Sequence, residues 1–416
     1  MREMKDSGLK WLGKIPADWT LAKIGGLYSI RNEKVSDKDY PPLSVTNKGI
    51  LPQLETAAKT NDGDNRKLVR VGDFAINSRS DRRGSCGISP YDGSVSLINI
   101  VMVPRKEMVP TYYEWLFHTT QFGDENYRWG HGIVDDLWTT GWQDMKKITI
   151  PMPPLDEQRR IAKYLDAKCA EIDALAADIQ TQIDTLEQYK RSVVFRAVSQ
   201  GITQAAMKKT DSDVWTIIPS NWDLIDIKYL FEIVKRIAGK EGYDILAVTQ
   251  RGLKIKDISS NEGQIANDYS GYQLVYPTDF VMNHMDLLTG WVDCSTQFGV
   301  TSPDYRVFIL RDKERNNLHY FKYVMQCCYM CRIFYSLGQG VSQLGRWRLQ
   351  TSSFNNFKVP VPPTETQLEI AIFLDAKIAE IDSIIDQKKD QLSTLEAYKK
   401  SLIYEYVTGK KEVPAR

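Results

Sequence analysis

The sequence predicts an α+β protein: two similar globular domains separated by two long helices that form an antiparallel coiled coil, with a pseudo-twofold internal repeat. The first observation behind this prediction is a duplication. The segment from Pro151 to Lys190 recurs from Pro360 to Lys399 at an offset of 209 residues, without a gap. The second is a heptad pattern of apolar residues in both copies, which is typical of coiled coils. Because the offset is about half of the 416-residue length, the chain is one unit present twice, which suits a target with two halves.

Four segments follow from the repeat, in the order domain, helix, domain, helix. Their expected bounds are 1–152, 153–205, 206–361 and 362–416. Each domain opens with an I-P-x-x-W pattern, at Ile15–Trp19 and at Ile218–Trp222. We interpret this pattern as a packing element that holds the first strand of its domain.

Within the domains, short β-branched and aromatic runs predict strands, and two segments with helical spacing predict helices. The strands are expected over Val71–Asn77, Ser94–Val103, Tyr276–Asn283 and Tyr305–Leu310, and the helices over Tyr112–Thr119 and Leu318–Met330. The two globular parts match each other far less well than the helical blocks do. This contrast is expected if the helices share one role while the domains recognise different things.

The two helices show the clearest periodicity in the chain. Apolar residues recur at heptad spacing and are expected to form the seam between the helices: Leu165, Ile172, Ile179, Leu186 and Val193, then Leu374, Ile381, Leu395 and Leu402. Ile161, Leu175 and Tyr189 are expected beside the first stripe. Lys388 interrupts the second, which is widened by a flanking stripe of Ile378, Ile385 and Leu392. Neither stripe is expected to remain exposed, so each is the obvious partner of the other. A helix of about 45 residues is roughly 65–70 Å long.

The helix ends carry their own signals. A Pro-Pro step blocks helix formation before each start. Thr364 with Gln367 fits a capping box, in which each residue satisfies a backbone N–H of the first turn. Gly201 and Gly409 are the expected helix stops.

Composition limits the class of protein. With 54 basic and 53 acidic residues the net charge is +1, whereas a protein that relied on phosphate contacts alone would be far more basic. No apolar run approaches the ~18 residues of a membrane span, and the N-terminus is too polar for a secretory signal, so we expect a cytoplasmic protein that does not bind membranes. The six cysteines include a lone C-x-x-C at Cys328 and Cys331, which we interpret as packed, reduced thiols rather than a metal site.

Catalytic signatures are missing from the sequence. There is no N-P-P-aromatic or D-P-P-aromatic motif of an adenine methyltransferase, and the four histidines offer no convincing Ser/His/Asp set. The stretch from Gly8 to Lys14 has the spacing of a phosphate-binding loop, but Ile15 replaces the required Ser or Thr. We therefore expect no catalytic and no metal-binding residues in this chain.

Two motifs carry a family resemblance. The x-P-x-P-P-x-x-x-Q step into a Leu-Asp-x-Lys helix, present twice, resembles the specificity subunit of type I restriction-modification enzymes, as does the I-P-x-x-W opening of each domain. The resemblance covers essentially the whole chain; its helical blocks are specific and its globular parts only generally similar. It implies two target recognition domains, each reading half of a bipartite site in double-stranded DNA, with the helices as spacers. It also implies two methyltransferase subunits and restriction (motor-nuclease) subunits as partners, which would carry S-adenosylmethionine and ATP, while this non-catalytic chain holds no cofactor.

Candidate DNA-contacting residues were sought in Gly-rich or polar loops, because Arg, Lys, Asn and Gln read base edges and bind phosphates. The candidates are Lys48, Arg66, Lys67, Arg79, Arg82, Arg83 and His131 in the first domain, and Arg251, Lys254, Lys256, Gln339, Gln343, Arg346 and Arg348 in the second. At an offset of 208 residues, Gly130-His131-Gly132 matches Gly338-Gln339-Gly340, which makes His131 equivalent to Gln339. For each single candidate, an ordinary solvated surface position is the alternative. Trp138 and Trp347 are expected to anchor loops rather than to stack on bases.

Other functions remain open from the sequence. A stand-alone DNA-binding regulator with the same two domains would bind its site without partners, although the near-neutral charge argues against it. A scaffold would use the two domains to bind proteins. An enzyme of an unrelated class is disfavoured by the scarcity of histidines and of cofactor motifs.

Overall fold

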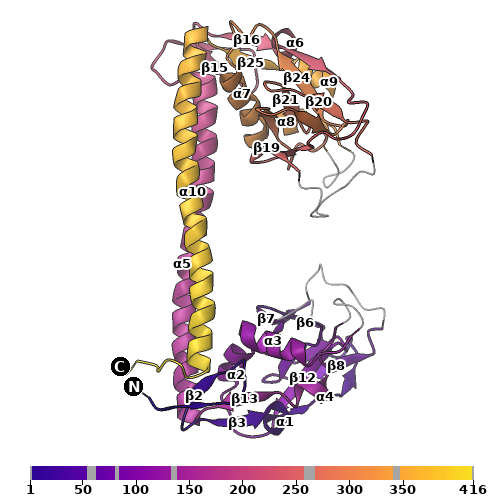
Figure 1. The fold of residues 1–416 in the computed structure, drawn as a ribbon, viewed down its shortest axis with the longest axis vertical. Helices are drawn as coiled ribbons and strands as arrows, with labels where there is room; N and C mark the ends of the chain where they lie inside the picture. The colour runs from indigo at the N-terminus through magenta and orange to yellow at the C-terminus, as the bar shows by residue number, and fades with distance from the viewer. Residues whose placement is uncertain are drawn as a thin grey trace. The chain divides into compact units, whose positions relative to one another are not determined.

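The computed structural model describes residues 2–53, 62–79, 84–132, 138–256, 268–340 and 347–414. Four of the candidate residues, Arg82, Arg83, Gln343 and Arg346, lie outside this part of the chain. The chain divides into two compact units (Figure 1). Unit 1 comprises Met1–Gln180 with Asp390–Arg416, and unit 2 comprises Thr181–Lys389. Each unit therefore contains one globular domain and a part of each long helix.

The domain of unit 1 is built on a four-stranded antiparallel sheet in the order β10-β9-β12-β4, with a three-stranded sheet β11-β8-β5 and a hairpin β6–β7 beside it. The strands are β1 Met4–Asp6, β2 Lys14–Pro16, β3 Thr20–Lys23, β4 Tyr28–Ile30, β5 Lys34–Val35, β6 Leu43–Thr46, β7 Gly49–Pro52, β8 Arg66–Val69, β9 Phe74–Asn77, β10 Cys86–Ile88, β11 Gly93–Val95, β12 Asn99–Pro104 and β13 Thr149–Met152. The helices are α1 Ile24–Leu27, α2 Pro110–Phe117, α3 Thr120–Arg128 and α4 Trp142–Met145.

The domain of unit 2 repeats this plan. Its four-stranded sheet has the order β17-β24-β21-β22, which matches β4-β12-β9-β10 strand for strand, and the hairpin β18–β19 corresponds to β6–β7. The strands are β14 Met207–Lys209, β15 Ile217–Pro219, β16 Asp223–Asp226, β17 Phe231–Val234, β18 Leu246–Thr249, β19 Gly252–Ile255, β20 Gln273–Val275, β21 Phe280–Met282, β22 Val292–Cys294, β23 Gly299–Thr301, β24 Arg306–Leu310 and β25 Lys358–Val361. The helices are α6 Ile227–Leu230, α7 Leu318–Met330, α8 Ile333–Ser336 and α9 Thr351–Asn355. The internal repeat therefore includes the globular domains, although their sequences have diverged.

The predicted α+β class and the helix Leu318–Met330 are confirmed, whereas the strand expected over Ser94–Val103 is wrong in one respect. It is two strands, β11 and β12, because the N–H of Asn99 donates to the carbonyl of Ser96 at 3.0 Å and turns the chain. β11 then pairs with β8 and β12 with β9, so the two halves of the apolar run belong to different sheets.

The two long helices are α5 (Leu155–Gln200) and α10 (Thr364–Val407), and they lie side by side in Figure 1. In unit 1, Tyr164 contacts Tyr406 and Asp173 binds Lys399 at 2.6 Å, so residue numbers rise along one helix as they fall along the other. The contacts of unit 2 show the same antiparallel order. They join Gln182 to Lys388 and Lys190 to Asp382.

The seam of this coiled coil is the predicted one. All nine apolar residues named for it are buried or partly buried. Lys388, which interrupts the second stripe, donates to the side chain of Gln182. Ile161, expected beside the seam, is buried, whereas Leu175 and Tyr189, expected there too, are each 49% exposed.

The glutamine of the P-P-x-x-x-Q motif joins each long helix to its domain. The side-chain oxygen of Gln158 accepts the N–H of Val109, which precedes α2, at 2.9 Å, and its amide donates to the carbonyl of Pro153 at 2.8 Å. Gln367 does the same with Asn317, which precedes α7, and with Pro362, at 2.8 and 2.9 Å. Because these bonds occupy the side chain of Gln367, the expected capping box with Thr364 is wrong. The Thr364 hydroxyl instead donates to the carbonyl of Arg315.

Two repeated residues join the helices to each other. Lys399 of α10 binds Asp173 of α5 at 2.6 Å in unit 1, and Lys190 of α5 binds Asp382 of α10 at 2.6 Å in unit 2. Asp173 and Asp382 stand 209 residues apart, as do Lys190 and Lys399. The duplicated Glu-Ile-Asp and Tyr-Lys motifs therefore form one ion pair, made twice.

Each I-P-x-x-W pattern is a packing element, as predicted. Trp19 and Trp222 are almost completely buried. The glycine that ends a long helix packs on the Trp of the same unit, because a Cβ on Gly409 would lie 3.0 Å from the ring of Trp19 and one on Gly201 would lie 3.2 Å from Trp222. Both glycines have positive φ, +70° and +79°, which confirms the expected helix stops.

All six cysteines are free, and Cys327 and Cys331 lie 3.9 Å apart, sulfur to sulfur. Among the residues described, no group of three or more His, Cys, Asp or Glu side chains is arranged to hold a metal ion. In the same part of the chain, no helix combines the length and the apolar character needed to span a membrane.

Candidate nucleic-acid interface

The G-x-G loop of each domain is closed by a two-residue bridge. His131 and Thr139 exchange two backbone hydrogen bonds of 3.0 Å, and Gln339 and Arg348 exchange two of 3.0 and 3.1 Å. The equivalence of His131 and Gln339 is thus supported by identical backbone pairing. Three of these side chains, those of His131, Gln339 and Arg348, are exposed, and that of Thr139 is partly buried.

A tryptophan anchors each loop, because glycine leaves room for its ring. A Cβ on Gly130 would lie 2.3 Å from the indole nitrogen of Trp138, and one on Gly340 would lie 3.1 Å from the ring of Trp347. Trp138 also stacks on Tyr127 and donates to its carbonyl at 2.8 Å. The expectation that these tryptophans hold loops in place fits this packing.

In the first domain the structure adds Arg79 to the loop. Arg79 forms an antiparallel bridge with Thr139, so Arg79 and His131 lie on either side of it. The exposed Arg79 follows the buried β9, where its N–H donates to the side chain of Asn77 at 3.0 Å. We call Arg79, Thr139 and His131 the first platform.

The second domain has the same arrangement with other side chains. The N–H of Met285 donates to the side chain of Asn283 at 3.2 Å, which is the turn that Arg79 makes with Asn77. The N–H of Leu349 donates to the carbonyl of His284 at 3.0 Å, as that of Thr140 does to Ser78 at 2.9 Å. Met285, Arg348 and Gln339 therefore correspond in position to Arg79, Thr139 and His131, and we call them the second platform. Sequence reasoning missed Met285 because it sought only polar side chains.

Burial lowers the pKa values of two side chains next to the second platform, those of His284 and Arg306. Burial, with the nearby Arg306 and Arg348, lowers the pKa of His284 to about 4, so this imidazole is neutral at pH 7. Burial also lowers the pKa of Arg306 to about 10, and its guanidinium donates to the carbonyl of Leu349 at 3.1 Å while lying over the ring of Phe354. This buried arginine holds the segment that carries Arg348, since it bonds to the carbonyl of the next residue.

Other candidates lie on the hairpins. Lys48 and Arg251 occupy the exposed turns of β6–β7 and β18–β19, and Lys254 is exposed on β19. Lys256 follows β19, is partly buried, and donates its backbone N–H to the carbonyl of Ile245 at 2.8 Å.

The structure places two candidates inside the first domain instead. Arg66 is 4% exposed, and its guanidinium donates to the hydroxyl and carbonyl of Ser94 at 2.8 and 3.1 Å. Lys67 donates to the carbonyl of Asn99 at 2.6 Å, and burial lowers the pKa of both side chains. Both cations already donate to carbonyl groups inside the domain, those of Ser94 in β11 and Asn99 in β12. We therefore do not include Arg66 and Lys67 in the interface.

Comparison with known proteins gives the family. A family model described as the type I restriction modification DNA specificity domain matches residues 16–188 and 219–394, well over half of the chain. The putative type I restriction enzyme MjaX specificity subunit of Methanocaldococcus jannaschii is 22% identical over 435 residues, covering 96% of this chain and 95% of that protein. The MjaVIII specificity subunit of the same organism is 23% identical over 432 residues, covering 95% and 94%.

Solved structures share the fold. A chain from a study of complex assembly and conformational transition of the type I R-M system has a TM-score of 0.68 at 14% identity, covering 95% of this chain and 99% of that one. The HsdS subunit from Thermoanaerobacter tengcongensis has a TM-score of 0.50 at 14% identity, covering 98% and 100%. Two α+β domains joined by an antiparallel coiled coil, with both halves matched by the DNA specificity model, place the chain in the class of type I DNA specificity proteins. The chain belongs to the family of type I restriction-modification specificity subunits.

Proposed function

We propose that this chain reads a bipartite DNA site for a type I restriction-modification complex, one half-site per domain. The observation that carries the proposal is the pair of platforms. Corresponding backbone positions carry Arg79, Thr139 and His131 in one domain and Met285, Arg348 and Gln339 in the other. Equal scaffolds with different donors and apolar groups suit two half-sites of different sequence, because base edges are read by such side chains.

The partners belong to the same proposal. Two methyltransferase subunits and the restriction subunits would carry S-adenosylmethionine, ATP and the chemistry, while this chain supplies recognition, holds no cofactor and is not itself an enzyme. In support, the curated relatives are named specificity subunits of type I restriction enzymes. The cytoplasm, where such a complex meets the chromosome, is the proposed location.

Genome-wide base-modification sequencing tests the proposal directly. The methyltransferase partner is expressed with and without this chain in a host that lacks such methylation. We expect one split motif to become methylated only when both proteins are present, and the motif gives both half-sites at once. Methylation of a continuous motif, or of none, would contradict the proposal.

A gel shift with the purified chain separates the stand-alone regulator from the specificity subunit. The regulator would bind the split motif tightly without partners. We expect tight, motif-selective binding only after the methyltransferase has been added, because a net charge of +1 gives the isolated chain little general attraction to DNA.

A further inference from the structure

Two hairpins, one in each domain, end in the same rigid turn. The tips are Thr46–Gly49 between β6 and β7, and Thr249–Gly252 between β18 and β19. In each tip the threonine hydroxyl donates to the glycine carbonyl, at 2.9 and 2.8 Å, and accepts the N–H of the residue before that glycine, at 3.1 and 3.2 Å. The glycines have φ of +97° and +98°, which other residues rarely adopt. We call these turns the threonine-clasped tips.

The chemistry at the two tips is also alike. Asn47 and Lys48 stand at the first tip, and Gln250 and Arg251 at the second, so each presents an exposed amide followed by an exposed cation. The platforms, in contrast, differ between the domains. If the two domains read different half-sites, a feature that is the same in both domains cannot be what distinguishes one half-site from the other. Amides and cations both donate to phosphate oxygens, which are the same in every DNA sequence.

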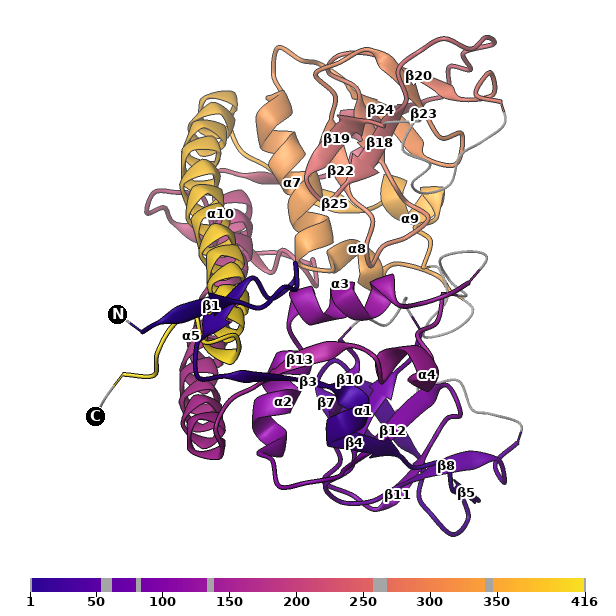
Figure 2. The same ribbon diagram turned by 60° about the horizontal axis from the view of Figure 1, so that its bottom comes forward.

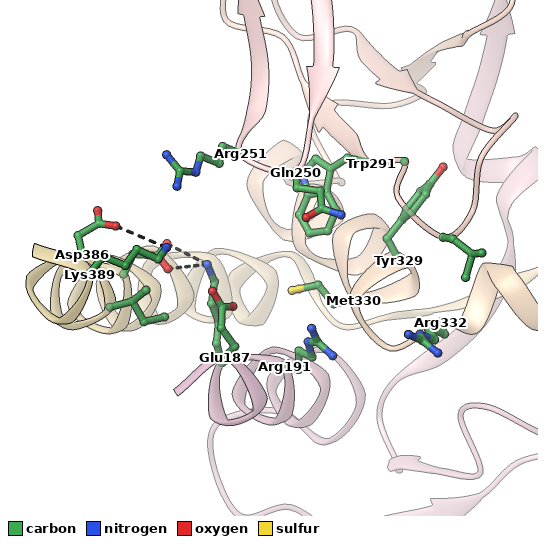
Figure 3. Close-up of a pocket in the computed structure, with 15 residues that line it drawn as sticks. Glu187, Arg191, Gln250, Arg251, Trp291, Tyr329, Met330, Arg332, Asp386 and Lys389 are labelled. Carbon is green, nitrogen blue, oxygen red and sulfur yellow. Dashed lines mark hydrogen bonds and ion pairs between the residues drawn. The ribbon is translucent and has the colours of Figure 1, made fainter. Parts of the chain in front are cut away.

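The surroundings of the second tip favour an anion as ligand. Arg251 borders a cavity of about 580 Å³ together with Arg191 of α5 and Arg332, which precedes α8 (Figure 3). Among the described residues, these three guanidinium groups make no hydrogen bond or ion pair. Three acidic side chains also line the cavity: Asp382 and Asp386 are each ion-paired with a lysine of the same cavity, whereas among the described residues Glu187 has no ion pair. Three arginines from separate elements thus face one unpaired carboxylate, which leaves the cavity a positive charge for an anionic ligand.

We propose that the threonine-clasped tips hold the phosphate backbone of DNA without regard to sequence, and that Arg191 and Arg332 complete the phosphate site beside the second tip. The inference rests on the proposed function, since the DNA duplex is the ligand. It assigns the tips to positioning the domains on DNA and leaves sequence reading to other parts of each domain.

An exchange of the two tips is the most direct experiment. The variant combines Asn47→Gln and Lys48→Arg with Gln250→Asn and Arg251→Lys, which swaps the tips while keeping the amide, the charge and the clasp. We expect the methylated motif to be the same as that of the unchanged chain. A change in either half-site would overturn the inference, because the tips would then read bases.

Loss of a cation tests the contact itself. Lys48→Ala, Arg251→Ala, Arg191→Ala and Arg332→Ala are each assembled with the methyltransferase, and fluorescence anisotropy measures binding to a duplex with the motif and to a scrambled duplex. Each variant is expected to bind both duplexes more weakly by the same factor, and to lower the slope of log Kobs against log salt concentration by about 1. Lys209→Ala is the matched control, since Lys209 is an exposed lysine on β14.

The outcomes separate this inference from the proposed function. If the unchanged complex does not prefer the motif, the proposed function fails. If it does prefer the motif and the tip variants match Lys209→Ala in affinity and salt slope, only the phosphate site fails. A loss confined to the motif duplex would also overturn it. Thermal unfolding confirms that each variant is folded.

Discussion

Arg79 and Arg348 differ from the other exposed cations among the candidates, because the backbone of each forms a bridge with a neighbouring segment beside a G-x-G loop. Arg79 pairs with Thr139 and Arg348 with Gln339, so the backbone that carries each side chain is held in place. A held backbone lowers the entropy cost of placing a guanidinium against one base edge. We therefore expect sequence reading from these positions.

Replacing Arg79 with Ala should relax one half-site only. A bidentate arginine contact to guanine contributes about 1–3 kcal/mol of discrimination against the wrong base. The methylated motif should become degenerate at a position read by the first domain and stay unchanged in the other half, while Arg348→Ala should do the converse. Lys10→Ala, at an exposed lysine of the same domain as Arg79, is the control. Degeneracy in both halves from a single variant would contradict this assignment.

His284 gives the second domain a distinct acid sensitivity. Its folded pKa is about 4, below the ordinary histidine value of 6.5, so the unfolded chain takes up a proton between these values and the folded chain does not. Stability is therefore lost as pH falls from 6.5 toward 4. The variant His284→Gln should lose less of its unfolding temperature between pH 7 and pH 5 than the unchanged protein, whereas His131→Gln, at an exposed position, should behave like it. Equal losses in all three proteins would refute the prediction.

Single residues are also where the sequence misled. Arg66 looks like a DNA contact because it begins a polar, basic stretch. Its partner Ser94 lies 28 residues away, and only the pairing of β8 with β11 brings the two together. No local pattern reveals such a buried arginine.

At the scale of elements, the duplicated motif x-P-x-P-P-x-x-x-Q is explained by one side chain. Gln158 and Gln367 each join the start of a long helix to the residue before a domain helix. Both glutamines are almost fully buried, at 2% and 1% exposure. Removing one leaves a backbone N–H and a carbonyl without their partner.

The variant Gln367→Ala should destabilise unit 2 by about 2–3 kcal/mol, since it loses two hydrogen bonds and orphans buried polar groups. Thermal unfolding followed by circular dichroism measures the change. Gln387→Ala, at an exposed glutamine of the same helix, should shift stability by no more than about 0.5 kcal/mol. Similar shifts for the two variants would show that the motif serves another purpose.

An element was predictable when its two copies are separated by nearly the same number of residues as the long helices are. It was not predictable when that offset differs. The heptad seam and the G-x-G loops follow from offsets of 209 and 208 residues. The threonine-clasped tips are 203 residues apart, so insertions between the tip and the helix hide their equivalence. Their shared T-x-[K/R]-G pattern is too short to identify without the matching hairpins.

At the scale of the whole molecule, the proposed bipartite site implies that the length of the long helices sets the DNA spacer between the two half-sites. We call this the ruler hypothesis. Inserting four residues near the middle of α5 adds about 6 Å, close to two base-pair steps of ~3.4 Å, and a coiled coil accommodates such an insertion by local unwinding. The recognised spacer should lengthen while both half-sites stay the same. As a control, the same four residues inserted into the exposed connector after Thr203 should leave the motif unchanged. An unchanged spacer in the α5 variant, read by base-modification sequencing, would rule out the ruler hypothesis.

The core of unit 1 is completed by residues of α10, and this affects the order in which the two domains can fold during translation. Ile403, Tyr406 and Val407 of α10 are buried in its core, the hydroxyl of Tyr112 donates to the carbonyl of Val407 at 2.7 Å, and both termini lie beside the helices (Figure 2). Unit 2, by contrast, is one continuous stretch. On a ribosome the first domain emerges first but cannot close its core until the last helix has been synthesised. The second domain is therefore finished before the first, and a nascent chain exposes apolar surface of its first domain until α10 has been synthesised.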